Sequence, residues 1–152
     1  MGQWRIFCFR SPKVFAFATW QGVVWQTRKT IMVVDDNPDI ITIVKTILEG
    51  KGYTVWSASS GLELLNHLKS QKPDLIILDI MMPEMDGLEV LGRLKGAPDW
   101  ATIPVILLTA KVQYEDVLGG YKLGADYYIT KPFTSTQLVN GINLLLGEAK
   151  VS

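Results

Sequence analysis

From residue 30 onward, short runs of apolar residues alternate with longer stretches in which apolar residues recur at a spacing of three and four. A run without polar alternation is typical of a strand buried on both faces, whereas the longer spacing is typical of an amphipathic helix. Five such pairs follow one another, which predicts a parallel sheet with helices on both faces. The expected strands are 31–34, 53–57, 75–79, 103–109 and 127–131, and the expected helices begin near residues 38, 61, 88, 114 and 135.

Polar residues mark where several of these helices begin. Asn37 is a favoured N-cap and is followed by Pro38, which suits the first helical position. Ser60 and Glu63 form a capping-box pattern, and residues 134–137 offer another cap. Asp86 with Gly87 indicates a turn and a helix cap. In the fourth helix, residues 119 and 120 are both glycine, which indicates either a soft helix or close packing.

Chemically active side chains follow four of the five predicted strands. Asp35 and Asp36 come directly after the first strand, and Asp79 ends the third. Thr109 ends the fourth strand, and Lys131 ends the fifth. Ligand sites of open α/β sheets lie just beyond the carboxyl ends of the strands, so these side chains are expected to share one site. Three converging carboxylates repel one another, which favours a bound cation, and oxygen ligands favour Mg²⁺.

The order acid pair, single acid, threonine and Lys-Pro resembles the receiver domain of two-component response regulators. The resemblance covers roughly residues 30–147 and implies a doubly wound, five-stranded parallel sheet of the flavodoxin or CheY type, with strand order 2-1-3-4-5. We therefore assign residues 28–150 to a receiver domain and residues 1–27 to an atypical N-terminal extension.

The resemblance also implies roles for these residues. Asp79 is the expected phosphoryl acceptor, and Thr109 and Lys131 are expected to contact the phosphoryl oxygens. The expected ligands of Mg²⁺, with Mn²⁺ as an alternative, are Asp36, Asp79, the backbone carbonyl of Met81 and, partly through water, Asp35. Thr109 and Tyr128 are the expected switch residues, a static packing role being the alternative for Tyr128. No cofactor beyond the metal and no enzymatic activity beyond self-phosphorylation and dephosphorylation are expected.

A receiver implies two kinds of partner. The phosphoryl donor is a sensor histidine kinase or a phosphotransfer protein, and the downstream protein binds the face formed by the fourth helix, fifth strand and fifth helix. A homodimer is an alternative, although the last helix has Asn140 and Asn143 in place of an arginine that many transcriptional receivers use to pair. A competing hypothesis is an interaction module that is never phosphorylated. A phosphatase with an aspartyl intermediate is disfavoured, because Met81 occupies the position of its second acid.

Charge and composition narrow the function further. The first 29 residues carry a net charge of +5, and the remaining chain carries −5. An acidic domain argues against a nucleic-acid-binding face. The single cysteine, Cys8, indicates a reducing compartment, so we expect a cytoplasmic protein. No apolar run approaches the 18 or so residues of a membrane span. Few residues follow the last helix, so a stand-alone receiver is expected.

The first 27 residues hold seven of the 15 aromatic residues, and nothing in them resembles a receiver. They could be a non-native start, or a hairpin of strands 14–19 and 23–27 that docks on the domain or on a second copy. A basic amphipathic anchor for a membrane or a partner is a third alternative. A cleaved signal peptide is the weakest, because Trp20 and Gln21 interrupt the apolar stretch.

Overall fold

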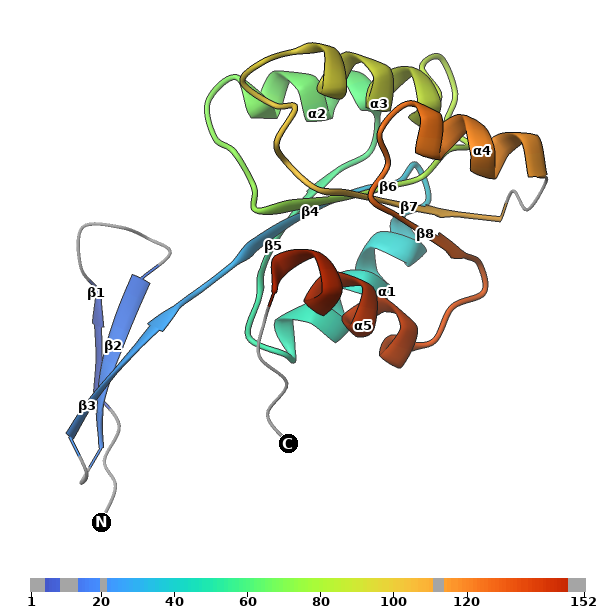
Figure 1. Ribbon diagram of the computed structural model, residues 1–152. Helices are drawn as coiled ribbons and strands as arrows, with labels where there is room; N and C mark the ends of the chain where they lie inside the picture. Colours follow the sequence, from blue (N-terminus) through green and yellow to red (C-terminus); the bar gives the residue numbers. More distant parts are fainter. Residues whose placement is uncertain (1–4, 9–13, 20–21, 111–113, 148–152) are drawn as a thin grey trace.

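A computed structural model describes residues 5–8, 14–19, 22–110 and 114–147 of the chain. Its centre is a parallel sheet of five strands in the order β5-β4-β6-β7-β8, which is the predicted order 2-1-3-4-5 within the domain (Figure 1). The strands are β4 (Thr30–Val34), β5 (Thr54–Ala58), β6 (Leu75–Leu78), β7 (Val105–Thr109) and β8 (Tyr127–Thr130). The helices are α1 (Pro38–Glu49), α2 (Gly61–Leu68), α3 (Gly87–Gly96), α4 (Tyr114–Lys122) and α5 (Ser135–Leu146).

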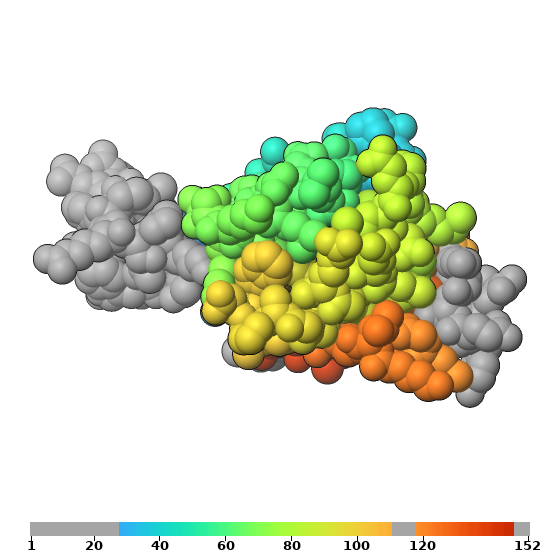
Figure 2. All heavy atoms as spheres, turned by 90° about the horizontal axis from the view of Figure 1, so that it is seen from above, coloured from blue at the N-terminus to red at the C-terminus, as the bar shows by residue number. Residues whose placement is uncertain are grey.

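The helices cover both faces of this sheet, as the apolar strands require. Helices α1 and α5 lie on one face, and α2, α3 and α4 lie on the other (Figure 1). Seen from above, α2, α3 and the described part of α4 form a continuous surface over the sheet (Figure 2). Each layer has its own cluster of buried apolar side chains, with alternate residues of β4, such as Ile31 and Met32, entering opposite clusters. The strands are therefore buried on both sides, as their sequence predicts.

Four helices begin at polar caps that the sequence predicts. The side chains of Asn37, Ser60, Asp86 and Thr134 each accept a hydrogen bond from a backbone N–H in the first turn. Only the cap at Thr134 is a reciprocal capping box. At α2, the Glu63 carboxylate bonds the backbone N–H and the hydroxyl of Ser59, one residue before the position that a capping box requires. These bonds, the backbone one first, lower the pKa of Glu63.

Several expected strand boundaries shift by one or two residues. β4 begins at Thr30 and β5 ends at Ala58, one residue beyond the predicted limits, and β8 ends at Thr130, one residue short of its limit. β5 begins at Thr54 and β6 ends at Leu78, one residue inside the predicted limits. β7 begins at Val105 rather than Ile103, because Pro104 has no N–H with which to join the ladder. Within α4, a Cβ on Gly120 would lie 2.6 Å from Leu107 of the sheet, so close packing explains this glycine.

A partly buried lysine, Lys95, connects loops at the amino ends of β7 and β8, at the edge of the sheet opposite the acidic residues. Lys95 Nζ donates to the carbonyls of Ala101 and Ile103 and lies 3.4 Å from an Asp126 carboxylate oxygen. That oxygen also accepts the N–H of Val105 at 2.9 Å, at the start of β7. The network fixes the connections on both sides of β7.

Residues before the domain form a second, antiparallel sheet in the order β1-β2-β3. Its strands are β1 (Arg5–Cys8), β2 (Val14–Thr19) and β3 (Gly22–Thr27). β2 and β3 match the expected hairpin within one residue, whereas β1 was not expected. The turn between these two expected strands, at Gln21 and Gly22, lies partly outside the described residues. The assignment of residues 1–27 as a separate extension stays a prediction.

Candidate functional site

Backbone hydrogen bonds between neighbouring strands place the acidic residues and the lysine at one edge of the sheet. The N–H of Asp35 donates to Ala58 of β5, and the N–H of Asp79 donates to Val34 of β4. The N–H of Lys131 donates to Thr109 of β7. Each of these three residues therefore extends the sheet by one position. Since all strands are parallel, their side chains meet beyond the carboxyl ends, where the sequence predicts a site.

Asp79 lies at the centre of this site, with 4% of its surface exposed. One carboxylate oxygen accepts the backbone N–H of Met81 at 3.2 Å, and the other lies 3.6 Å from Lys131 Nζ. The buried Thr109 side chain forms a further hydrogen bond with Asp79. The carboxylate therefore has a fixed position and a cation beside it.

Asp35 is also buried, and both of its oxygens are used. Oδ2 lies 2.7 Å from Lys131 Nζ, and Oδ1 accepts the N–H of Asn37 at 2.9 Å. Lys131 is thus closer to Asp35 than to Asp79, a preference that the sequence did not predict. The Lys131–Pro132 peptide bond is cis, as expected from the resemblance. Asp36 is exposed at the mouth of the site.

Burial raises the pKa of Asp79, and the neighbouring Asp35 carboxylate raises it further. The positive charge of Lys131 and the hydrogen bonds from Met81 and Thr109 lower the pKa and oppose this shift. Among the described residues, one lysine, Lys131, thus lies beside two buried carboxylates, Asp35 and Asp79. These described side chains alone leave excess negative charge in the site.

The arrangement fits a small divalent cation. Asp35, Asp36 and Asp79 each offer a carboxylate oxygen, and these three oxygens lie within 4.8 Å of one another. An all-oxygen donor set that is open to solvent on one side suits Mg²⁺, which binds through few carboxylates and retains several waters. The excess negative charge supports the same conclusion.

The loop between β6 and α3 closes one side of the site in a strained conformation. The N–H of Met85 donates to the carbonyl of Pro83 at 2.8 Å, and Glu84 between them has a φ of 68°. This is a γ-turn with a non-glycine centre, a rare conformation. Asp86 then caps α3, as predicted, instead of joining the acidic cluster.

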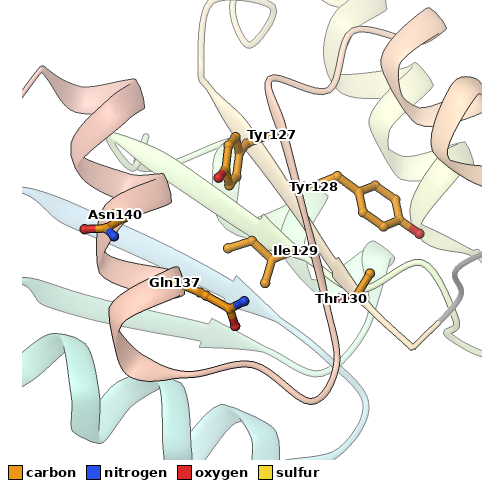
Figure 3. A pocket seen from close by; sticks show the side chains of 6 residues that line it. All are labelled: Tyr127, Tyr128, Ile129, Thr130, Gln137 and Asn140. Carbon is orange, nitrogen blue, oxygen red and sulfur yellow. The ribbon is translucent and has the colours of Figure 1, made fainter.

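Two adjacent tyrosines on β8 face different layers of the molecule. Tyr127 packs on the side of α5, and Tyr128 packs on the side of α2 and α3 (Figure 3). They help to line a pocket of about 230 Å³ with Ile129, Thr130, Gln137 and Asn140. The switch position that the resemblance assigns to Tyr128 therefore lies in the layer that includes α4 (Figure 1).

Sequence reasoning missed three contributors to the site. The N–H groups of Asn37 and Met81 hold the two buried carboxylates, and backbone donors leave no signal in residue identity. Gly87, which was assigned only to a turn and cap, lies directly against the Asp79 backbone. Lys111, which the family resemblance places beside the site together with Met81, lies outside the described residues.

The fold and the site together define a receiver domain. The response regulator receiver domain family matches residues 31–143, and the chain belongs to that family. It is therefore a receiver of two-component signal transduction, as its strand-end residues predict. None of the helices among the described residues has the length and apolar character needed to cross a bilayer.

Particular relatives support this identification. The alkaline phosphatase synthesis transcriptional regulatory protein PhoP of Bacillus subtilis is 40% identical over 124 residues, which are 82% of this chain and 51% of PhoP. The chain thus spans about half the length of this relative. The receiver domain of a signal transduction histidine kinase from Syntrophus aciditrophicus is 41% identical, with a TM-score of 0.74 over 82% of this chain and 94% of that one.

A more distant structure bears on the metal. The receiver domain of sensor histidine kinase PA1611 from Pseudomonas aeruginosa is 25% identical, with a TM-score of 0.74 over 80% of this chain and all of that one. It has a magnesium ion coordinated in its active-site cleft. Relatives thus include receivers of histidine kinases as well as transcriptional regulators.

Proposed function

We propose that Asp79 accepts a phosphoryl group from a histidine kinase or a phosphotransfer protein, and that phosphorylation changes the affinity of this domain for a downstream protein. The observation that carries the proposal is the placement of one buried carboxylate beside Lys131, Thr109 and a second buried carboxylate. A structural aspartate at a strand end does not need a cation and a hydroxyl aimed at it.

The chemistry is an exchange of one bond to phosphorus. A carboxylate oxygen of Asp79 attacks the phosphorus of a phosphohistidine, the new O–P bond forms, and the P–N bond breaks. The histidine nitrogen leaves with the electron pair. Lys131 Nζ and the Thr109 hydroxyl would then bind the oxygens of the transferred group, since both already contact Asp79. The exposed Ala110 leaves the approach to this point open.

Asp35, Asp36, Asp79 and the Met81 carbonyl would hold Mg²⁺, or Mn²⁺ in its place. When bound, the metal neutralises charge on the carboxylates and on the phosphoryl oxygens. The three carboxylate oxygens within 4.8 Å of one another support this donor set. The Met81 carbonyl and the choice of Mn²⁺ rest on the family resemblance alone.

The output depends on Thr109, Tyr128 and the face of α4, β8 and α5. A phosphoryl group adds about −1.5 to −2 charge and strong acceptors, which would draw the Thr109 hydroxyl toward it. The half-buried Tyr128 would then occupy the space that Thr109 leaves. A protein partner, or a second copy of the chain, would recognise the changed face. The acidic charge of the domain supports a protein and not a nucleic acid at this face.

Met81 bears on the lifetime of the phosphorylated state. Its side chain is 58% exposed, and its backbone contacts the Asp79 carboxylate. A bulky apolar group here, together with Lys111, which lies outside the described residues, would hinder the attack of water, so we expect a moderately long-lived phosphoaspartate. A half-life of seconds with Mg²⁺ present would contradict this expectation. The cytoplasmic location expected from the single cysteine stays a prediction.

The test is labelling with acetyl phosphate and Mg²⁺, read by intact mass. We expect the wild type to gain the mass of one phosphoryl group and Asp79→Asn to gain none. Asp86→Asn is the matched control, because Asp86 lies in the adjacent loop and caps α3. Equal labelling of wild type and Asp79→Asn would disprove the proposed acceptor. Beryllofluoride with Mg²⁺ tests the switch: unchanged NMR signals of Thr109 and Tyr128 would favour the phosphorylation-independent module.

A further inference from the structure

Gly87, the first residue of α3, lies against the backbone of Asp79 with no space for a side chain. A Cβ built on Gly87 would collide with the carbonyl oxygen of Asp79 and would stand 2.7 Å from the Cα of Ile80. The obstacles are backbone atoms, which cannot rotate away as the end of a flexible side chain can. Gly87 is buried, and its φ is not in the left-handed region, so close approach and not backbone freedom accounts for a glycine here.

The same residue holds the peptide unit that points at the Asp79 carboxylate. The carbonyl of Ile80 accepts the N–H of Gly87 at 2.8 Å and the N–H of Met82 at 3.1 Å. In the same planar peptide unit, the N–H of Met81 donates to Asp79 Oδ1. Fixing the carbonyl therefore fixes the direction of the opposite N–H. Gly87 is thereby connected to the carboxylate through this peptide unit, because its N–H bonds the Ile80 carbonyl and the Met81 N–H bonds Asp79 Oδ1.

The other side of Asp79 is held by the sheet, since its N–H donates to Val34 of β4. The Asp79 backbone is thus confined between β4 and the start of α3. From this position its carboxylate contacts Lys131 and Thr109. A shift of a few tenths of an ångström along the Gly87 contact would move the carboxylate relative to both groups.

The geometry points to Gly87 as a positioning residue for the Asp79 carboxylate, which it orients through the Ile80–Met81 peptide. This inference rests on the proposed function of Asp79. Gly87 itself would touch neither the metal nor the phosphoryl group. Its contribution is the absence of a Cβ, which allows α3 to begin against the peptide next to the reacting group.

The test compares Gly87→Ala with the same substitution at a second glycine, whose added Cβ would meet a side chain far from Asp79. A Cβ on Gly141 would lie 3.0 Å from the Tyr127 ring, on the opposite face of the sheet, so Gly141→Ala is the matched control. In metal-free protein we expect the amide NMR signal of Met81 to shift in Gly87→Ala and to stay in place in Gly141→Ala. The dissociation constant for Mg²⁺ alone should rise by about tenfold in Gly87→Ala, the scale found for groups that orient metal ligands. Labelling by acetyl phosphate should slow to a similar degree, and Gly141→Ala should change neither.

A second pair of variants covers the case in which Gly87→Ala does not fold. Asp86→Ala removes the cap that accepts the N–H of Glu89 and loosens the start of α3, whereas Asp86→Asn removes the same charge and keeps a capping oxygen. We expect the Mg²⁺ dissociation constant to be roughly threefold higher in Asp86→Ala than in Asp86→Asn, because capping defines where the helix begins.

The outcomes separate the two proposals. Normal Mg²⁺ affinity and an unshifted Met81 signal in Gly87→Ala, or equal effects in Gly141→Ala, would overturn the positioning role while Asp79 remains the acceptor. Equal Mg²⁺ affinity in the two Asp86 variants would overturn it if Gly87→Ala is unfolded. A failure of wild-type labelling would instead remove the proposed function, and the metal-free Met81 signal would still report on the contact.

Discussion

Replacing Asp79 by asparagine should make the metal-free protein more stable. Among the described residues, the site of the wild type has two buried carboxylates, Asp79 and Asp35, and one lysine, Lys131, that contacts both. Asparagine has nearly the shape of aspartate, and its amide oxygen can still accept the N–H of Met81. The substitution therefore removes one buried charge and keeps the packing.

The magnitude follows from the charges around Asp79. At an effective dielectric constant near 20, two unit charges 4 Å apart interact by about 4 kcal/mol. The repulsion from Asp35 and the attraction to Lys131, whose Nζ is 3.6 Å from Asp79, are both of this order and largely cancel. What remains is the cost of burying the Asp79 charge, reduced by its hydrogen bonds. We expect the free energy of unfolding to rise by about 1–2 kcal/mol at pH 7, or roughly 4–8 °C in Tm.

The pH dependence follows from the raised pKa of Asp79. Its folded pKa lies above its unfolded pKa, so the folded state favours the protonated carboxyl. Asp79 therefore contributes most to wild-type stability below the unfolded pKa, and this contribution is lost as the pH rises through the folded pKa. The advantage of Asp79→Asn should be smallest below about pH 4, the ordinary carboxyl pKa, and should grow toward neutral pH.

The assay is urea unfolding in EDTA at acidic and neutral pH, followed by tryptophan fluorescence. The control is Asp74→Asn, since the Asp74 carboxylate accepts the N–H of Thr30 at 2.7 Å, in a structural role. We expect this control to lose about 1 kcal/mol at pH 7. A lower unfolding free energy for Asp79→Asn than for wild type at pH 7 would show that Lys131 neutralises the site, and our account of its charge would be wrong.

Three further predictions concern other parts of the domain. Lys131→Met should slow acetyl phosphate labelling by at least about tenfold. It should also bind Mg²⁺ more tightly, because the cation 2.7 Å from Asp35 is gone. Calorimetric titration measures the Mg²⁺ affinity, and weaker binding than in the wild type would contradict the prediction. Glu84→Gly should raise the free energy of unfolding by about 0.5–1 kcal/mol, because glycine adopts the φ of 68° without strain. Urea unfolding measures this change, and a variant less stable than the wild type would contradict the prediction. Lys95→Met should lower the free energy of unfolding by about 1–3 kcal/mol, because it leaves two partly buried carbonyls without their donor, and labelling at Asp79 should not change. Slower labelling would mean that the Lys95 network affects the site.

The sheet and the main residues of the site could be predicted from the sequence because both depend on simple periodicity. A strand that is apolar on both faces is expected to be buried on both faces. Parallel strands have their carboxyl ends at the same edge of the sheet. Asp35, Asp79, Thr109 and Lys131 were therefore expected to lie together before any coordinates were known. Their observed proximity follows from topology, whereas their chemical roles remain proposals.

Contacts that depend on exact distances could not be predicted. Nothing in the residue types indicates that Lys131 lies closer to Asp35 than to Asp79, because both are carboxylates at strand ends. The collision that a Cβ on Gly87 would cause also needs coordinates, since a glycine at a helix start is compatible with a plain turn. The left-handed φ of Glu84 could not be predicted either, because residues other than glycine rarely adopt such a φ and nothing in the sequence marks this position.

The opposed packing of Tyr127 and Tyr128 offers a practical way to follow this molecule. Consecutive positions of one edge strand report on separate layers, one beneath α5 and the other on the opposite side. Incorporating fluorotyrosine would give each of these two adjacent rings its own ¹⁹F resonance. A structural change confined to one side of the sheet would shift one resonance and leave the other unchanged, so that the unchanged resonance would serve as an internal reference.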